Sequence, residues 1–317
     1  MLSRRSLLAA ALVLGVTPAL AQSDAAAPAA KLPVVASFSI LGDFVKNVGG
    51  DRIAMTTIVG PNSDTHVYQP TPNDAKKLAA AKVVFVNGLG FEGWMDRLVK
   101  ASGTKATVVV ATTGIKPRER TADEPQDDDE KPKGKKEAHA HGAIDPHAWQ
   151  SVANAKVYVA NIRDGLIAAD PAGKDVYTAN AAAYLAKLDA LQADVLKAVA
   201  AIPDDHRRII TSHDAFGYFG DAYGLKLLAP EGVSTESEAS AKDVGRIIRQ
   251  IKAQKVPAVF LENVSDPRLM DRIAKESSAK VGGTLYSDAL SDDKGPATTY
   301  IDMVQSNLRA LSAALSS

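Results

Sequence analysis

The sequence predicts an α/β protein of two lobes, each with a mainly parallel sheet flanked by helices. Strand-like and helix-like segments alternate between residues 33 and 110, and they alternate again between residues 209 and 315. Such alternation is typical of parallel sheets, because a crossover, usually a helix, must carry the chain back to the start of the next strand. The longest helical stretch lies between the two regions, from Asp175 to about Ala201, and we expect it to bridge the lobes.

The first alternation has recognisable start and stop signals. Gly49-Gly50 ends the first helix, and Thr71-Pro72-Asn73-Asp74 gives a later helix a capping residue with proline at its first position. Strands are expected at 33–38, 52–59, 82–87 and 107–110, and helices at 41–48, 72–80 and 92–101. The pattern then stops in a run of acidic residues followed by lysines, which predicts a mobile loop at about 118–143.

The second half repeats this plan after two helices. The first helix is expected at 151–168. The bridging helix carries apolar residues at helical spacing over many turns and must therefore bury one face. These residues are Tyr177, Ala181, Tyr184, Leu188, Leu191, Val195 and Val199. Further strands are expected at 209–210, 225–228, 258–261 and 283–286, with helices at 216–223, 240–254, 267–275 and 298–315.

Composition indicates an exported globular protein. Arg4-Arg5, an apolar core from Leu7 to Val16 and Ala19-Leu20-Ala21 predict a signal peptide over residues 1–21, of the ordinary secretory or the twin-arginine type. We expect the mature chain to comprise an N-terminal lobe (32–174), a bridging helix (175–202) and a C-terminal lobe (203–317). The chain has no cysteine, so a metal site must use nitrogen and oxygen ligands. The formal net charge of +0 does not suggest nucleic acid as a partner.

Four side chains follow strand-like runs, the place where open parallel sheets bind ligands. Asp145-Pro146 presents His147 from a turn, His66 follows Asp64-Thr65, His213 follows Ser212, and Asp288 follows Tyr286-Ser287. Folding could bring these three imidazoles and one carboxylate together as metal ligands. Taken alone, His66 and His213 are more often satisfied polar residues, His147 is as often a turn residue as a ligand, and Asp288 is more often part of a turn.

Several neighbouring residues have two interpretations. Asp64 and Asp145 each precede a candidate ligand by two residues, so they are either hydrogen-bond partners of its ring or ordinary turn residues. Glu262, at a strand end, is either such a partner or solvated. His139 and His141 could capture zinc weakly, but a solvated loop is the simpler interpretation. We interpret Trp149 as a packing residue.

The order of these motifs resembles the periplasmic metal-binding proteins of ABC importers, the ZnuA/TroA-like family. The resemblance spans nearly the whole mature chain. It rests on Asp64-Thr65-His66 followed by Tyr68-Gln69-Pro70-Thr71-Pro72, on Asp145-Pro146-His147-Ala148-Trp149, on Thr211-Ser212-His213-Asp214-Ala215-Phe216-Gly217-Tyr218-Phe219 and on Tyr286-Ser287-Asp288. It implies two α/β lobes joined by one long rigid helix, with a metal held by His66, His147, His213 and Asp288.

The resemblance also bears on which metal is bound. Manganese binders of this family carry a carboxylate at the position of His213, so an imidazole there indicates zinc. Three imidazoles and one carboxylate suit tetrahedral Zn²⁺, whereas Mn²⁺ prefers more oxygen. Family members with this ligand type also take manganese, so both metals stay open.

The expected function is therefore periplasmic, high-affinity Zn²⁺ binding and delivery to an inner-membrane ABC permease, without catalysis. We expect a monomer, with a periplasmic metallochaperone as a second candidate partner. Binding requires neutral imidazoles, so acidification through about pH 6.5 should weaken it. The rigid helix should restrict metal-linked motion to loops around the cleft.

Three other functions are alternatives to metal transport. A zinc hydrolase would use Asp288 or Glu262 as general base and needs an open coordination position. A serine hydrolase built on Ser212, His213 and Asp214 is disfavoured, because adjacent residues rarely form a catalytic relay and no Gly-x-Ser-x-Gly turn surrounds Ser212. A receptor or adhesin would use zinc structurally and would unfold without it.

Overall fold

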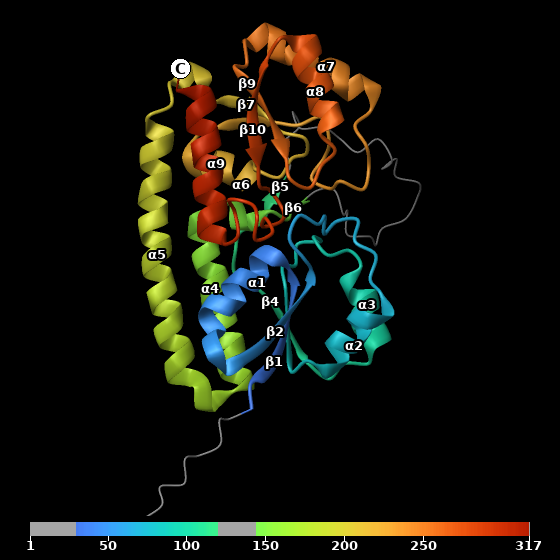
Figure 1. Cartoon of the computed structure of the whole chain (residues 1–317), viewed down its shortest axis with the longest axis vertical. Coiled ribbons are helices and arrows are strands. Elements are labelled where there is room, and N and C mark those ends of the chain that lie inside the picture. Colours follow the sequence, from blue (N-terminus) through green and yellow to red (C-terminus); the bar gives the residue numbers. More distant parts are fainter. Residues whose placement is uncertain (1–29, 120–143, 317) are drawn as a thin grey trace, which may run out of the picture. The chain divides into compact units, whose positions relative to one another are not determined.

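The structure, a computed structural model, describes residues 30–119 and 144–316. The expected signal peptide, most of the expected loop at 118–143, and both His139 and His141 lie outside the described residues. The described part contains two four-stranded parallel sheets with flanking helices and one long connecting helix (Figure 1). This confirms the fold class expected from the sequence.

The first sheet has the strand order β2-β1-β3-β4, and all three pairings are parallel. Its central strands are short apolar runs, as expected for a sheet covered on both faces. The strands are β1 (Leu32–Phe38), β2 (Ile53–Val59), β3 (Val83–Val86) and β4 (Thr107–Val110). The helices between them are α1 (Ser39–Gly49), α2 (Pro72–Ala80) and α3 (Met95–Ser102).

Helix α3 begins three residues later than the sequence pattern predicts, at Met95 instead of Glu92. The Glu92 carboxylate is buried and accepts hydrogen bonds from the backbone N–H groups of Asn87 and Gly88 and from the Ser37 hydroxyl. A side chain committed to the preceding loop in this way holds residues 87–92 as a turn, so the helix starts only after it.

The second sheet has the order β10-β9-β7-β8 and is also parallel. Strand β10 begins earlier than expected and contains a register shift at Gly282-Gly283, which interrupts the apolar pattern used to predict it. The strands are β7 (Arg208–Ile210), β8 (Lys226–Leu228), β9 (Ala258–Glu262) and β10 (Lys280–Leu285). The helices are α6 (Gly217–Tyr223), α7 (Ala241–Gln254), α8 (Pro267–Ser277) and α9 (Tyr300–Leu315).

Two helices connect the sheets, α4 (Val152–Ala169) and the 27-residue α5 (Lys174–Ala200). Helix α5 spans about 40 Å and runs beside α4, α1 and α9 (Figure 1). It buries the seven apolar residues that its sequence spacing predicted, from Tyr177 to Val199. Short 3-10 helices lie at Gly50–Arg52, Ala148–Gln150, Pro171–Gly173 and Asp204–His206.

A short antiparallel pair, β5 (Arg118–Glu119) and β6 (Ile144–Asp145), was not predicted. Each strand has two residues, too few to give a period in the sequence. The pair joins the two ends of the segment at 120–143 and places Asp145, and therefore His147, at a fixed point.

One apolar core extends from Val34 in the first sheet to Leu315 in α9 and includes the buried face of α5. Asp43 of α1 contributes a polar contact to this joint, because its carboxylate accepts from the Tyr300 backbone N–H at 3.0 Å and from the Tyr184 hydroxyl at 3.3 Å. The two lobes therefore have this apolar core in common and do not meet across a hydrated interface. Of the helices at 30–119 and 144–316, none combines the length and the apolar character needed to cross a membrane.

Replacing the Asp43 carboxylate tests how much its hydrogen bonds stabilise the packing of α1 against α5 and α9. An Asp43→Ala change leaves the buried Tyr300 N–H and Tyr184 hydroxyl without their acceptor, so the free energy of unfolding should fall by about 1–3 kcal/mol. Urea titration measures this, with Asp194→Ala on the exposed side of α5 as the control. Equal stability of the two variants would contradict a role for Asp43 in joining the helices.

Candidate metal centre

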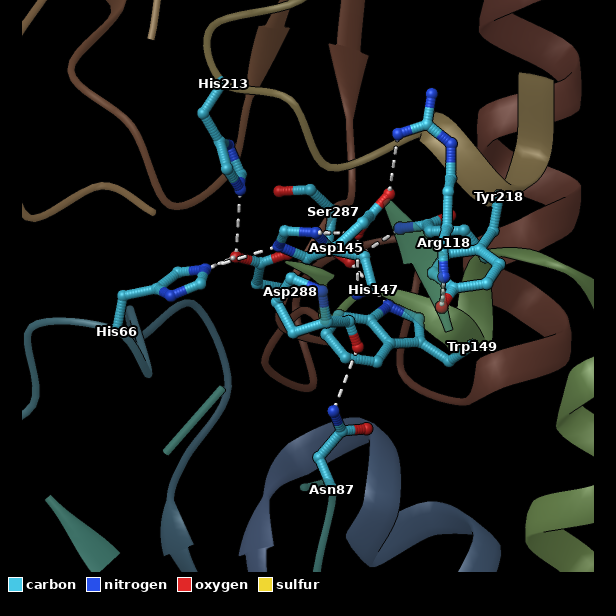
Figure 2. A network of polar contacts seen from close by, with 12 residues as sticks. His66, Asn87, Arg118, Asp145, His147, Trp149, His213, Tyr218, Ser287 and Asp288 are labelled. Carbon is cyan, nitrogen blue, oxygen red and sulfur yellow. Dashed lines mark hydrogen bonds and ion pairs between the residues drawn. The ribbon is translucent and has the colours of Figure 1, made fainter. Parts of the chain in front are cut away.

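Three of the four predicted ligands lie in loops at the carboxyl ends of the two parallel sheets, and the fourth follows the short antiparallel pair β5-β6. His66 lies in the loop after β2, His147 follows β6, His213 follows β7 and Asp288 follows β10. Figure 2 shows the imidazoles of His66 and His213 pointing toward the Asp288 carboxylate from different sides, with His147 beside it. One donor atom from each of the four residues lies within 4.8 Å of every other.

The spacing of these donor atoms fits a small cation. The Nε2 atoms of His66 and His147 lie 3.3 Å apart, and Asp288 Oδ2 lies 3.3 Å from His66 Nε2 and 3.1 Å from His213 Nε2. The second oxygen, Oδ1, lies 3.5 Å from His147 Nε2. A tetrahedron with metal–ligand bonds of 2.0–2.1 Å has edges of about 3.3 Å. With Asp288 Oδ2 as the carboxylate donor, three of the six separations lie close to this edge length, and the whole set of donors lies within 4.8 Å.

The candidate ligands are buried, and His66 is the one with some exposed surface. His147, His213 and Asp288 have no exposed surface, whereas His66 is 6% exposed. His66 also lines a cavity of about 530 Å³ together with Tyr68 and Phe91. An ion from solvent would therefore reach the donors past the ring of His66.

The ring of His147 is oriented by Asp145. Asp145 Oδ1 lies 2.8 Å from His147 Nδ1 and also accepts from the His147 backbone N–H. Its other oxygen lies 3.5 Å from Arg118 Nη1. A proton on Nδ1 leaves Nε2 with a free lone pair directed at the site, the usual arrangement for a metal-binding histidine.

Glu262 plays the same part for His213. Its Oε2 lies 2.7 Å from His213 Nδ1, and its Oε1 accepts from the backbone N–H groups of Ser212 and His213. Glu262 is buried at the end of β9, so of the two interpretations of this carboxylate the structure favours the ring partner. The sequence could not decide this, because a glutamate at a strand end is more often solvated.

Asp64, like Asp145, lies two residues before a candidate ligand, but it does not contact the ring of that histidine. It forms an Asx turn, accepting from the His66 backbone N–H at 2.8 Å, and its other oxygen accepts from the Thr235 hydroxyl at 2.6 Å. The His66 ring instead packs edge-on against Phe91, with ring centroids 4.8 Å apart. Asp64 thus shapes the loop and ties it to residue 235, and its interpretation as a ring partner is wrong.

Burial and the acidic partners shift the pKa values of the three histidines in opposite directions. Burial lowers the pKa of His66. Burial acts the same way on His147, but the charges of Asp288 and Asp145 outweigh it and raise the pKa of His147 to about 9. Glu262 and Asp288 likewise overcome burial and hold the pKa of His213 well above its usual range. In return, His147 and His213 outweigh burial and hold the pKa of Asp288 well below its usual range.

Sequence reasoning missed the residues that connect the two sides of the site. The Trp149 indole N–H and the Gln150 side-chain amide both donate to the Ser287 carbonyl, and Tyr300 donates to the Trp149 carbonyl. The sequence presented Trp149 as an apolar packing residue, and its aromatic contacts bear that out. No sequence signal marked Gln150.

Comparison with known proteins gives concordant results. The family model for the zinc-uptake complex component A, periplasmic, matches residues 34–314. The manganese-binding lipoprotein MntA of Halalkalibacterium halodurans is 34% identical over 286 residues, covering 90% of this chain and 89% of the relative. The iron-binding protein YfeA of Yersinia pestis is 34% identical over 288 residues, covering 91% and 88%.

Solved structures of periplasmic metal-binding proteins are also similar to this chain. The periplasmic zinc-binding protein TroA of Treponema pallidum superposes with a TM-score of 0.80 at 29% identity, covering 91% of this chain and all of that one. A manganese-bound mutant of a periplasmic metal-binding protein from Candidatus Liberibacter asiaticus gives a TM-score of 0.79 at 30% identity, covering 90% and 100%. These similar proteins are named for different metals.

The raised histidine pKa values predict how metal-free protein responds to pH. A folded pKa of about 9 for His147, above the unfolded value of about 6.5, contributes stability that is complete below about pH 6.5 and is lost as the pH rises through about 9. Metal-free protein should therefore lose thermal stability between pH 6.5 and 9. Over the same interval Zn²⁺ affinity should rise, because fewer protons need to be displaced.

Calorimetry with and without chelator measures the first effect, and competition with a chromophoric chelator the second. Metal-free stability that increases from pH 6.5 to 9 would contradict the assigned charge state of His147. The sequence alone placed the change at about pH 6.5, because it does not reveal which carboxylates meet which ring.

The contact between Glu262 and His213 can be tested with Glu262→Gln. Glutamine keeps one oxygen for the two backbone N–H groups but presents an amide N–H₂ to His213 Nδ1, so the ring loses its charged partner. Metal affinity should fall by roughly 10–100-fold. Isothermal titration measures it, and the exposed Glu238→Gln change serves as the control. Wild-type affinity in Glu262→Gln would show that this contact does not orient the ring.

Proposed function

The chain belongs to the family of the zinc-uptake complex component A, periplasmic metal-binding components of ABC importers, and on that basis we propose that it binds Zn²⁺ and delivers it to an inner-membrane permease. Members of this family act as solute-binding transport components and not as enzymes. The metal is then the cargo of the protein, so the site must both hold it and release it.

We propose His66, His147, His213 and Asp288 as the ligands. The observation that carries this assignment is the set of donor separations of 3.1–3.5 Å, close to the edges of a tetrahedron around Zn²⁺. Three neutral imidazoles also favour Zn²⁺ over ions that prefer an all-oxygen shell. Asp145 and Glu262 support the assignment, because ligating histidines usually donate their other ring N–H to a carboxylate.

Binding without catalysis follows from the number of donors. Four protein ligands complete a tetrahedron, so a metal-bound water that could attack a substrate has no position. Both carboxylates that a zinc hydrolase could use as base are engaged with imidazoles, Asp288 with all three and Glu262 with His213. A relay from Ser212 through His213 is also disfavoured, since both ring nitrogens of His213 face acidic groups.

Manganese is the second candidate, and one feature of the site favours it. Both oxygens of Asp288 lie within 3.5 Å of imidazole nitrogens, so the carboxylate could supply two donors and bring the total to five. Mn²⁺ accepts more oxygen ligands than Zn²⁺ does. Relatives named for manganese and iron share about a third of their residues with this chain.

Further parts of the proposal concern the route and the partners. We propose export by a signal peptide at 1–21, a monomer made of lobes at 32–174 and 203–317 with a bridging helix at 175–202, and a metallochaperone as a second partner. The shared apolar core across α5 and α9 supports release through loop movement instead of lobe rotation. The loop of His66, which borders the cavity, is the natural moving part.

Metal analysis tests the function directly. Protein purified without added metal should contain one equivalent of zinc, and chelator competition should rank Zn²⁺ above Mn²⁺. His213→Ala should fold and lose the zinc, whereas His206→Ala, whose ring donates to the Leu315 carbonyl, should retain it. Tight manganese binding with feeble zinc binding would replace zinc by manganese as the cargo.

A further inference from the structure

The Ser287 carbonyl lies next to the candidate ligand Asp288 and receives two side-chain hydrogen bonds. Trp149 Nε1 donates to it at 2.9 Å and Gln150 Nε2 at 2.8 Å. Both donors belong to the 3-10 turn Ala148–Gln150 that directly follows His147, and all of these residues are buried. The backbone segment that carries one ligand therefore holds the peptide group that carries another.

The remaining backbone around Asp288 is held as well. On one side, the Asn307 side chain of α9 accepts from the Tyr286 N–H at 2.8 Å and donates to the Tyr286 carbonyl at 2.9 Å. On the other side, the Leu290 N–H donates to the Ser39 hydroxyl at 3.0 Å. With both flanks fixed, the freedom left to the carboxylate is rotation about its own side-chain bonds.

The orientation of the carboxylate presents both of its oxygens to the imidazoles. Oδ2 lies 3.1 Å from His213 Nε2 and 3.3 Å from His66 Nε2, and Oδ1 lies 3.5 Å from His147 Nε2. A tetrahedral Zn²⁺ needs only one of these oxygens, whereas an ion with more ligands gains from both. The Ser287 peptide group sets the point from which the Asp288 side chain starts, so a shift of this group changes how well both oxygens can face the ion.

We propose that Gln150 and Trp149 are positioning residues that determine metal preference, by holding Asp288 so that both of its oxygens face the ion and raising the affinity for Mn²⁺ relative to Zn²⁺. This inference rests on the proposed ligand set. It adds residues that do not touch the metal, and it names which metal benefits from them.

Gln150 is the better of the two for a test. Trp149 also packs against Phe38, Phe91 and His147, so changing it alters packing as well as hydrogen bonding. In Gln150→Met the side-chain length is kept and the Ser287 carbonyl still accepts from Trp149, so no buried acceptor is left without a partner. When the Ser287 peptide group is held less firmly, an ion bound by both Asp288 oxygens should lose more affinity than an ion bound by one.

The experiment measures Zn²⁺ and Mn²⁺ affinities of wild type and Gln150→Met by chelator competition. The ratio of Mn²⁺ to Zn²⁺ affinity should fall roughly fivefold, the effect of one hydrogen bond, while Zn²⁺ affinity stays near that of wild type. Co²⁺ bound to the variant should absorb more strongly in the visible range, as four-coordinate cobalt does. Asn161→Leu removes a side-chain amide that donates to the Ala111 and Thr113 carbonyls, and it should change neither readout.

An unchanged ratio, or equal losses for both metals with an unchanged cobalt spectrum, would overturn the inference and leave Gln150 as a merely structural residue. If Gln150→Met does not fold, Trp149→Phe removes the other donor while keeping an aromatic ring, and it should lower the ratio in the same direction. Wild-type protein that binds neither metal would instead refute the proposed function, and this inference with it.

Discussion

The rest of the structure depends on a carboxylate without exposed surface. Asp288 is buried among three imidazoles, and an ionised carboxylate in such a place is stable only beside positive charge. In the metal-free state, protonated His147 and His213 can supply that charge. A divalent cation can replace those protons, so loading exchanges one compensating charge for another. The buried carboxylate therefore has a compensating charge in either state.

The two sheets and the apolar core between them hold the four candidate ligands in place. Strands β2, β7 and β10 end near the site and are followed by the loops of His66, His213 and Asp288, whereas His147 follows the short strand β6. The apolar core that continues from the first sheet through α5 into α9 then fixes the two sets of loops relative to each other. Separating the lobes would expose this core, which supports the proposal that metal exchange is local. His66, the candidate ligand that borders the cavity, is the residue best placed to allow it.

Much of this could be predicted from the sequence. Apolar runs gave the order of strands and helices, and the spacing along α5 gave its buried face, because both follow from burial periodicity. The identity of the four converging side chains followed from the order of short motifs, each weak alone. The bounds were less accurate where a side chain overrides the local pattern, as Glu92 does at the start of α3. Strands of two residues left no pattern at all.

The partners of the candidate ligands were the least predictable part. Asp64 and Asp145 occupy the same position relative to a histidine, yet only Asp145 meets the ring, because Asp64 bonds to Thr235 at a sequence separation of 171 residues. The same holds for Gln150 and Ser287, which are 137 residues apart. Contacts of this kind depend on the packed arrangement of both lobes and leave no local signal.

In the proposed site, four protein side chains enclose one cation and leave it no solvent ligand. X-ray absorption spectroscopy of the zinc-loaded protein measures the ligands around the ion. We expect three imidazole nitrogens and carboxylate oxygen at about 2.0–2.2 Å and no further light ligand. Fewer than three imidazoles around the ion, or a coordinated water, would contradict it.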